Sequence, residues 1–333
     1  MKILVTGGAG YIGGTVSGLL VEKGHQVVAY DNLSHGRRDL LPSGVEFIEG
    51  ELEDRRKLED IFIAAKGEGK PFDGVLHFAA LIEAGESMVH PEQFFRNNTA
   101  SALALFEAML VHGPRRLVFS STAAVYGEPE AIPIKEDARL HPTNAYGESK
   151  LMVEQMLAWF HRIHGLRSAS LRYFNVAGAA EGASRGEAHN PESHLIPLVL
   201  DGALGRRKSI KIFGEDYPTA DGTCIRDYIH VSDLAEAHLL ALYALELPEA
   251  ADHRLVFNLG NGRGFSVREV IESARRVTGH PIPADVEPRR AGDPAVLVAS
   301  SEKAMLELGW RPKYTELDEI VRTAWVWHQK RYV

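Results

Sequence analysis

The sequence contains a single cysteine, Cys224, so no disulfide can form within the chain. It has no excess of basic residues either: the formal net charge is -8, which leaves no broad positive surface for nucleic acid or an anionic membrane. No apolar run approaches the roughly 18 residues of a membrane-spanning helix, and Lys2–Thr6 begins a strand pattern with no signal segment ahead of it. These absences predict a cytoplasmic protein that binds neither nucleic acid nor membranes and holds anionic ligands by local donors.

Short apolar runs flanked by turn residues alternate with segments that carry apolar residues at helical spacing. The predicted strands are Lys2–Thr6, Gln26–Tyr30, Val45–Glu49, Gly74–Ala79, Arg115–Ser120 and Arg167–Tyr173. The predicted helices are Gly14–Lys23, Arg55–Lys66, Glu92–His112 and Asn144–His164. This alternation predicts an α/β protein with a doubly wound parallel sheet of the Rossmann type.

The pattern loosens after about residue 175, where prolines separate short helical and strand-like pieces. We therefore expect a nucleotide-binding domain at 1–175 and a smaller, loop-rich lobe at 176–333. Val256–Leu259 has the composition of a further strand, so the segment from about 226 to 262 is expected to return to the first domain. The two domains would then exchange chain segments.

A glycine loop follows the first predicted strand, in Gly7-Gly-Ala-Gly-Tyr-Ile-Gly13. Small residues there permit a tight turn and close approach of a pyrophosphate to the N-terminus of the next helix. Asp31 ends the second strand, where a carboxylate accepts hydrogen bonds from an adenosine ribose. Because Asp31 would repel a 2′-phosphate, the pattern favours NAD over NADP, although Arg37 and Arg38 lie nearby. A glycine-rich turn capped by a buried aspartate is the structural alternative.

Tyr146 and Lys150 are four residues apart in a predicted helix, so their side chains lie on one face. A nearby ammonium stabilises a phenolate and lowers the tyrosine pKa from about 10, which would make Tyr146 a general base. Because this spacing also occurs by chance, the residues around Tyr146 and Lys150 must show whether the pair is catalytic. Thr122 ends Ser120-Ser-Thr122 at the carboxyl end of a strand, where parallel sheets place ligands, with helix capping as the alternative role.

These motifs resemble the extended short-chain dehydrogenase/reductases, and in particular the UDP-glucose 4-epimerase (UDP-galactose 4-epimerase) family. The matching segments are Thr6–Gly13, Asp31–Leu33, His77–Ala80, Tyr146–Lys150, Leu171–Asn175, Phe213–Thr219, Arg226–Val231 and Arg289–Asp293. The first and third mark the superfamily, whereas the last four are more particular to the epimerases. The resemblance covers nearly the whole chain.

The resemblance implies an NAD-dependent isomerase that interconverts UDP-galactose and UDP-glucose. The C4 hydrogen is not acidic, so it leaves as hydride to NAD and returns to the opposite face of a 4-keto sugar. Tyr146 would take the 4-hydroxyl proton, Thr122 would bond that oxygen or relay the proton, and Lys150 would hold the nicotinamide ribose. Arg226 and Arg290 would bind the pyrophosphate of UDP, with a salt bridge as the alternative for each.

The resemblance also implies two sets of binding residues. The cofactor set is Gly7, Gly10, Tyr11, Ile12, Gly13, Asp31, Asn32, Glu51, Leu52, Phe78, Ala79, Ala80, Asn97, Ser120, Tyr146, Lys150 and Tyr173. The substrate set is Thr122, Phe174, Asn175, His194, Leu195, Lys211, Phe213, Arg226, Arg290 and Asp293. Glu51, Ile82 and His194 depart from the family pattern, but none of them removes a catalytic group. Phe213 either stacks on uracil or belongs to the core.

Individual residues help to distinguish the 4-epimerase activity from related activities. Leu297 leaves room for a larger sugar, so 4-epimerases of UDP-N-acetylglucosamine or UDP-glucuronate are the nearest alternatives. A sugar 4,6-dehydratase needs an acid and a base directly after the threonine, and Ala123-Ala124 occupy those places. A noncatalytic NAD-binding sensor is a more remote alternative, because such proteins commonly lose the tyrosine or the lysine that this chain retains.

Two further expectations concern metals and assembly. No metal site is predicted, because His189 and His194 lie in a loop with no third ligand at a useful spacing. Helices Glu92–His112 and Asn144–His164 are apolar on more than one face. In the family that the chain resembles, two such helices from each subunit form a four-helix interface, so a homodimer is expected.

Overall fold

The computed structural model describes residues 1–251, 254–290 and 293–333, and the chain forms two compact units. The first unit comprises Met1–Gly127, Arg139–Arg172 and Ala235–Phe257. The second unit comprises Glu128–Ala138, Tyr173–Leu234 and Asn258–Val333. Among the described residues, no helix combines the length and the apolar character needed to cross a membrane.

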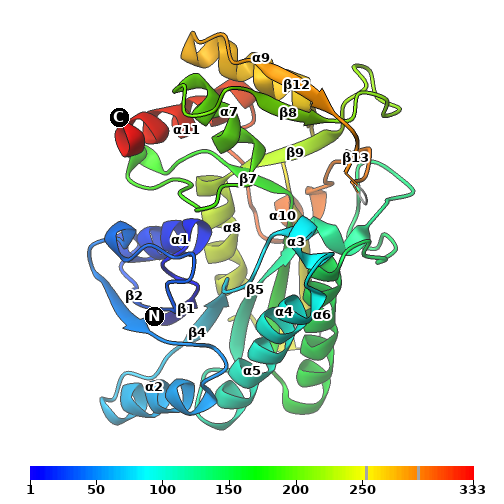
Figure 1. Cartoon of the computed structure of the whole chain (residues 1–333). Helices are drawn as coiled ribbons and strands as arrows, with labels where there is room; N and C mark the ends of the chain where they lie inside the picture. Colours follow the sequence, from blue (N-terminus) through cyan, green and yellow to red (C-terminus); the bar gives the residue numbers. More distant parts are fainter. Residues whose placement is uncertain (252–253, 291–292) are drawn as a thin grey trace. The chain divides into compact units, whose positions relative to one another are not determined.

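The first unit is built around a sheet of seven strands (Figure 1). The strands are β1 (Lys2–Thr6), β2 (Gln26–Asp31), β3 (Val45–Glu49), β4 (Gly74–His77), β5 (Arg116–Thr122), β6 (Arg167–Tyr173) and β10 (Leu255–Leu259). Their order is β10-β6-β5-β4-β1-β2-β3, and β1 pairs in parallel with both β2 and β4. The order reverses between β1 and β4, and doubly wound folds bind ligands at the carboxyl ends of the strands beside such a switch point.

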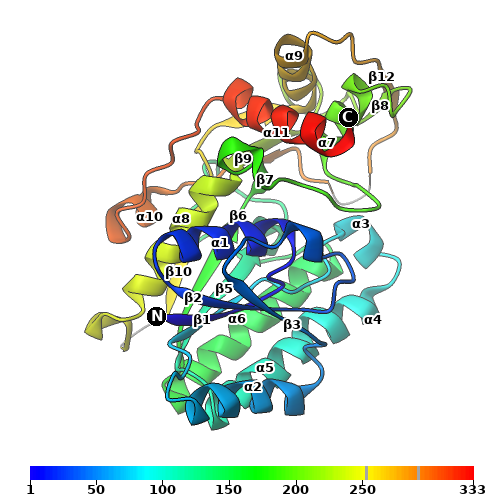
Figure 2. The same ribbon diagram turned by 90° about the vertical axis from the view of Figure 1, so that its left-hand side faces the viewer.

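Helices cover both faces of this sheet, with α1 on one face and α2, α5 and α6 on the other (Figure 2). The helices are α1 (Tyr11–Glu22), α2 (Arg55–Gly67), α3 (Ala84–Ser87), α4 (Pro91–Phe94), α5 (Ser101–Val111), α6 (Ala145–His164) and α8 (Val231–Ala244). Leu58, Phe106 and Leu157 bring α2, α5 and α6 into one buried cluster with the sheet. The predicted doubly wound α/β architecture is confirmed, and β10 joins the sheet as its edge strand, as its composition indicated.

Several predicted elements differ from the structure at their ends: α1 begins at Tyr11 rather than Gly14, and β5 ends at Thr122 rather than Ser120. The strand Gly74–Ala79 ends at His77, because the N–H groups of Phe78 and Ala79 both turn to the carbonyl of Thr6. The predicted helix Glu92–His112 is interrupted: a π-helical segment, η2 (Phe95–Ala100), separates α4 from α5. Such segments are rare in helices and are frequent at functional sites.

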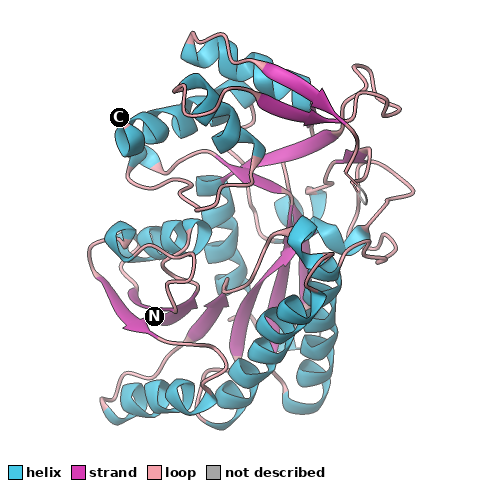
Figure 3. Ribbon diagram, in the orientation of Figure 1, coloured by secondary structure: helices cyan, strands magenta, loops and turns pink. Residues whose placement is uncertain are grey.

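The second unit has mostly shorter strands, and long loops join its elements (Figure 3). Its strands are β7 (Asn175–Ala177), β8 (Ile210–Phe213), β9 (Ile225–His230), β11 (Gly264–Ser266), β12 (Ala284–Glu287) and β13 (Val296–Leu297). Its helices are α7 (Leu195–Ala203), α9 (Val267–Thr278), α10 (Glu302–Glu307) and α11 (Leu317–Tyr332). The strand β9 pairs with β7, β11 and β13, while β8 pairs with β12. One buried cluster joins α7, α9 and α11 to these strands.

Candidate active site

The glycine loop is packed too closely for larger residues. Gly7 has φ +70°, and a Cβ on it would lie 2.6 Å from the backbone nitrogen of Ala79. A Cβ on Gly13 would lie 2.2 Å from the carbonyl oxygen of Gly7. The helix α1 begins at Tyr11 after Gly10, and no side chain caps it. Because the first-turn N–H groups of a helix point out of its N-terminus, this loop is suited to an anionic group such as a pyrophosphate.

Asp31 braces the glycine loop. It is 7% exposed, and its two carboxylate oxygens accept the N–H of Ala9 at 3.0 Å and the N–H of Leu33 at 2.8 Å. Burial raises the pKa of Asp31, and these two hydrogen bonds oppose that rise. A carboxylate oxygen accepts more than one hydrogen bond, so bracing the loop and binding a ribose are compatible. Next to it, Asn32 donates to Glu51 at 2.9 Å.

Arg37 and Arg38, which could bind the 2′-phosphate of NADP, each contact a residue of this chain. Arg37 forms an ion pair with Asp39 at 3.1 Å. The guanidinium of Arg38 lies over the ring of Phe47, 5.1 Å from its centre. Both side chains therefore have contacts of their own, which favours NAD over NADP.

Tyr146 and Thr122 are hydrogen-bonded to each other. Thr122 ends β5, where its hydroxyl accepts the N–H of Ala124 at 3.1 Å and donates to the phenolic oxygen of Tyr146. Asn144 caps α6 by accepting the N–H of Gly147 at 2.8 Å, which places Tyr146 in the first turn. A Cβ on Gly147 would lie 2.6 Å from the carbonyl oxygen of Ala124. This glycine therefore lets the helix approach the turn that carries Thr122.

Lys150 is buried one turn further along α6, at 2% exposure. Its ammonium donates to the carbonyl of Ser120 at 3.0 Å and lies 5.1 Å from the centre of the Phe119 ring. Burial lowers the pKa of Lys150 to about 7. Burial also raises the pKa of Tyr146 to about 12, against the hydrogen bond from Thr122. The expected lowering of the tyrosine pKa is not found here, because desolvation outweighs the stabilisation of the phenolate.

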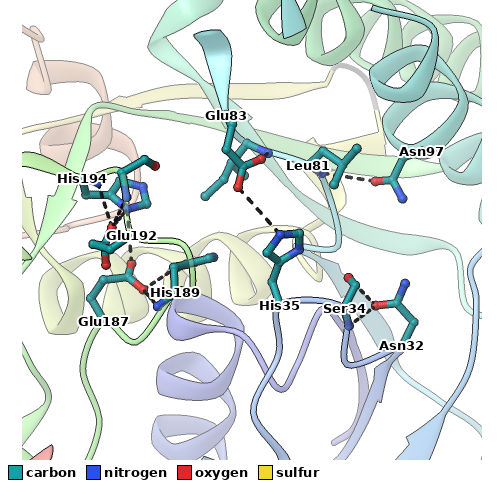
Figure 4. A network of polar contacts seen from close by, with 12 residues as sticks. Asn32, Ser34, His35, Leu81, Glu83, Asn97, Glu187, His189, Glu192 and His194 are labelled. Carbon is teal, nitrogen blue, oxygen red and sulfur yellow. Dashed lines mark hydrogen bonds and ion pairs between the residues drawn. The ribbon is translucent and has the colours of Figure 1, made fainter. Parts of the chain in front are cut away.

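The loop after β4 is tied to α6 by Asn98, a residue that the sequence pattern did not single out. Asn98 is 3% exposed and donates to the carbonyl of Leu81 and to the hydroxyl of Ser149, both at 3.0 Å. The N–H of Leu81 donates to the side-chain oxygen of Asn97 at 3.1 Å (Figure 4). It also donates to the side-chain oxygen of Asn98 at 2.8 Å. Asparagine is a poor helix former, so two adjacent asparagines within an apolar helical pattern could have indicated that Asn98 has a special role.

The same loop carries a negative charge close to the tyrosine. Glu83 follows Ile82, the position where a lysine occurs in some members of the resembled family, and its charge disfavours ionisation of Tyr146. Glu83 also pairs with His35 at 3.9 Å (Figure 4). Phe78 and Ala80, from the predicted cofactor set, lie partly buried where the chain leaves β4.

A buried ion pair lies behind Thr122, and it was also missed. Arg172 on β6 donates to Glu154 on α6 at 2.6 and 2.9 Å, and both side chains are 5% exposed or less. The hydroxyl of Ser121 donates to the same carboxylate at 2.5 Å, and Arg172 also donates to the hydroxyl of Tyr126 at 2.9 Å. The carboxylate thus joins β5, β6 and α6 next to Thr122, which follows Ser121 on β5.

In the second unit, three predicted substrate residues gather around Cys224. Burial raises the pKa of the Cys224 thiol, and the charges of Arg226, Asp293 and Arg290 all act on it. Arg290 pairs with Asp293 at 2.9 Å, and its guanidinium lies 4.9 Å from the centre of the Phe213 ring. Arg226, on β9, donates to the carbonyl of Ile225 at 2.9 Å. The arrangement offers two guanidinium groups and one aromatic face.

The remaining predicted residues of the second unit lie on separate elements. Lys211 is exposed on β8 and pairs with Glu287 at 3.3 Å. Phe174 is 6% exposed, so it is largely a core residue, whereas Asn175 is exposed at the start of β7. His194 precedes α7, which begins at Leu195, and Tyr173 ends β6.

The prediction that His189 and His194 lack a third ligand is wrong. Ligand atoms of Glu187, His189 and His194 all lie within 4.8 Å of one another. The histidines are also hydrogen-bonded to carboxylates: His189 to Glu187, and His194 to Glu192 at 2.8 Å (Figure 4). The spacing argument failed because Glu187 lies two residues before His189 in an irregular loop, where no helical or strand period relates the side chains.

The glycine loop at the switch point and Asp31 define a dinucleotide-binding α/β protein, in which Thr122, Tyr146 and Lys150 lie on one strand end and the first turns of one helix. The model of the NAD dependent epimerase/dehydratase family matches residues 3–260. The chain therefore belongs to this family, which confirms the resemblance seen in its motifs.

Named relatives are similar over nearly their whole lengths. The UDP-glucose 4-epimerase of Streptomyces lividans is 54% identical over 327 residues, covering 98% of this chain and 96% of the relative. The solved UDP-glucose 4-epimerase of Brucella ovis in complex with NAD is 42% identical, with a TM-score of 0.91 and coverage of 98% and 97%. That of Bifidobacterium longum in complex with NAD+ and UDP is 36% identical, with a TM-score of 0.90 and coverage of 99% of each chain.

Proposed function

We propose that this chain interconverts UDP-galactose and UDP-glucose, with tightly bound NAD as its cofactor. The observation that carries the proposal is the hydrogen bond between Thr122 and Tyr146, with Lys150 one turn further along α6. Alanines follow Thr122 at the two places where a dehydratase needs an acid and a base. Tyr146 is then the group that takes a proton and returns it, which suits reversible oxidation at one carbon. The relatives named above support UDP-hexose as substrate.

The first unit has residues that fit NAD. Gly7 and Gly13 occupy places where a Cβ would collide with backbone, and the uncapped start of α1 suits a pyrophosphate. Asp31 would accept hydrogen bonds from the adenosine ribose, with Asn32 and Glu51 beside it. NAD, when bound, supplies an acceptor for the C4 hydride and a donor for its return.

The chain itself moves the proton. Tyr146 accepts the proton of the sugar 4-hydroxyl and returns it after the sugar has presented its other face, while Thr122 donates a hydrogen bond to the reacting oxygen. In its protonated form, Lys150 one turn further along α6 would favour the charged phenolate electrostatically. Because burial raises the pKa of Tyr146 to about 12, this support is needed for the tyrosine to act as a base near neutral pH.

The UDP moiety must stay anchored while the sugar turns over. Arg226 and Arg290 are the proposed pyrophosphate ligands, since a guanidinium forms two parallel hydrogen bonds with phosphate oxygens. Arg290 would exchange its ion pair with Asp293 for the phosphate, and the Phe213 ring beside it supplies a stacking face for uracil. Strong contacts to the diphosphate and weak contacts to the sugar are the combination that this reaction requires.

The experiment is incubation of purified protein with UDP-galactose, without added reductant. We expect UDP-glucose to form, and Tyr146→Phe to slow its formation by about 10²–10⁴-fold. Tyr243→Phe should leave the rate unchanged, because the hydroxyl of Tyr243 bonds the exposed His25. Parallel reactions with UDP-N-acetylglucosamine and UDP-glucuronate test the alternative sugars. Bound NAD without turnover of any of them would instead support the noncatalytic sensor.

A homodimer is also proposed, on the exposed apolar side chains of two helices. Leu103 and Val111 on α5 are 37% and 58% exposed, and Trp159 and Ile163 on α6 are 61% and 64% exposed. Side chains of this kind on neighbouring helices are typical of surfaces that bind another chain. Sedimentation at micromolar concentration should give a dimer, and Trp159→Glu should give monomers; a monomeric wild-type protein would contradict the proposal.

A cytoplasmic location is proposed from the cysteine content. Cys224 is the only cysteine and is buried, so the fold needs no oxidising compartment. Fractionation of the producing cells tests this location, and recovery of the protein outside the cytoplasm would contradict it.

A further inference from the structure

Four ligand-type side chains converge in the loop that precedes α7. Glu187, His189, Glu192 and His194 lie within eight residues of sequence, and Figure 4 shows their side chains turned toward one another. Ligand atoms of Glu187, His189 and His194 lie within 4.8 Å of one another, and Glu192 lies 2.8 Å from the Nδ1 of His194. The imidazole rings are 5.6 Å apart between centres.

The backbone holds this cluster in place. The Oε1 atom of Glu187 accepts the N–H groups of Ala188 at 2.7 Å and His189 at 3.0 Å. The Oε1 atom of Glu192 accepts the N–H of His194 at 2.8 Å. On the other side, the indole of Trp327 on α11 donates to the carbonyl of Glu187 at 2.7 Å. The four side chains therefore belong to an organised loop, although it contains neither helix nor strand.

The cluster pairs two carboxylates with two imidazoles, and a divalent cation could take the place of the imidazole protons. The side chains of Glu187 and Glu192 are each 11% exposed, and within the described residues the ion pairs recorded for them involve only His189 and His194. Without a metal, backbone N–H groups and the imidazoles hold these carboxylates. Although burial opposes both shifts, the contact between the two groups raises the pKa of His189 and lowers the pKa of Glu187 to about 2. One divalent cation would balance both charges and would also use the two imidazoles.

We propose that Glu187, His189 and His194 bind a divalent first-row transition metal of the Zn²⁺ class, with Glu192 as a fourth ligand or as the hydrogen-bond partner of His194. Imidazole with carboxylate is a ligand set for zinc and its neighbours, whereas Ca²⁺ and Mg²⁺ take oxygen ligands. Tetrahedral zinc with bonds of roughly 2.1 Å places its ligand atoms about 3.4 Å apart. The Nδ1 of His194 already lies 3.8 Å from Oε2 of Glu187, whereas the Nδ1 of His189 is hydrogen-bonded to Oε1 of Glu187 and would exchange that hydrogen bond for the metal by rotation of its side chain.

The metal would act as a cross-link. The metal would join the two ends of the loop 187–194, which leads directly into α7. The helix α7 packs against α9 and α11 in the second unit. The proposal does not rest on the epimerase activity, because the proposed ligands belong to the second unit, whereas Thr122, Tyr146 and Lys150 belong to the first. His194 would then bind the metal in place of the substrate contact that the family resemblance implies for it.

The test uses the full-length protein after dialysis against a chelator. Zinc sulfate is titrated by calorimetry, and Co²⁺ serves as a spectroscopic probe of tetrahedral coordination. We expect one Zn²⁺ per chain, visible-region absorption from bound Co²⁺ that zinc abolishes, and an affinity at least about tenfold weaker in His189→Ala and in Glu187→Gln. His90→Ala is the matched control, since His90 lies 3.6 Å from both Glu86 and Glu92 on an exposed surface, and it should bind like wild type.

Two results would overturn the proposal. One is the absence of stoichiometric zinc binding by the wild-type protein, which would leave two protonated histidines paired with two carboxylates. The other is equal binding by wild type and by Glu187→Gln, which would place the metal elsewhere. Circular dichroism of each variant verifies its fold, and the cobalt spectrum of the wild type decides the matter even where a variant does not fold.

Discussion

The buried pair of Glu154 and Arg172 allows a sharp prediction, because its partners and its burial are both known. Glu154→Gln keeps the shape of the side chain and removes its charge, so Arg172 is left as a cation that is 5% exposed and has lost its anionic partner. Breaking a buried ion pair in this way destabilises a protein by about 3–5 kcal/mol. Ser121 also loses its charged acceptor at 2.5 Å, so a value toward the upper end is expected.

The pKa of Arg172 leads to the same expectation. Burial alone lowers the pKa of this guanidinium, but its hydrogen bonds and ion pair with Glu154 raise the net value above the usual one. Glu154 therefore stabilises the charged form that burial opposes. Removal of the carboxylate leaves the unfavourable desolvation of Arg172 without compensation.

The assay is urea unfolding followed by far-ultraviolet circular dichroism, for wild type and for Glu154→Gln. The matched control is Glu59→Gln, which breaks the exposed i,i+4 pair with Arg55 at 2.7 Å and should change the stability by less than about 1 kcal/mol. The double variant Glu154→Met with Arg172→Met should recover most of the loss, since apolar residues of similar volume often replace a buried pair at little cost.

Activity provides a second readout for the same variant. Because Ser121 precedes Thr122 on β5, we expect Glu154→Gln to lower kcat more than it raises KM, with the variant assayed well below its unfolding midpoint. The reasoning is refuted if Glu154→Gln unfolds within about 1 kcal/mol of wild type, or if the double methionine variant is less stable than the single variant.

Three other predictions concern the first unit. Tyr146→Phe should lower kcat by about 10²–10⁴-fold without shifting the unfolding midpoint, and an activity within tenfold of wild type would exclude Tyr146 as the base. Gly147→Ala should lower kcat at least tenfold, because the added Cβ would lie 2.6 Å from the carbonyl oxygen of Ala124; Gly67→Ala, with nothing within 4 Å, is the control, and equal activities would contradict the packing argument. Burial lowers the pKa of His77 from 6.5 to about 3 in the folded protein. Between these pH values the unfolded chain binds a proton on His77 and the folded chain does not, so the stability falls as the pH drops from about 6.5 toward 3. The loss amounts to about 5 kcal/mol at most, and acid unfolding of His77→Gln should lack this component if the folded protein excludes the proton.

Local sequence determined the framework of this protein. The glycine loop, the strand and helix periods and the four-residue spacing of Tyr146 and Lys150 are relations between near neighbours, and backbone sterics fix what they can form. The fold class and the family followed from these patterns. The start of α6 after Asn144 and the end of β1 at Thr6 lie within a residue of expectation for the same reason.

Tertiary structure decided what depends on distant residues and on burial. Asn98 bonds Ser149 across 51 residues, and Ser121 bonds Glu154 across 33, so no local period could reveal either contact. The pKa of Tyr146 was expected to fall because Lys150 is near in sequence, yet desolvation raises it to about 12, and desolvation is a property of the packed site. The carboxylate that completes the Glu187–His189–His194 cluster also depends on how an irregular loop closes. The sequence by itself thus determined which groups are present and along which elements they lie, while only the packing decided which of them meet and how strongly they hold their protons.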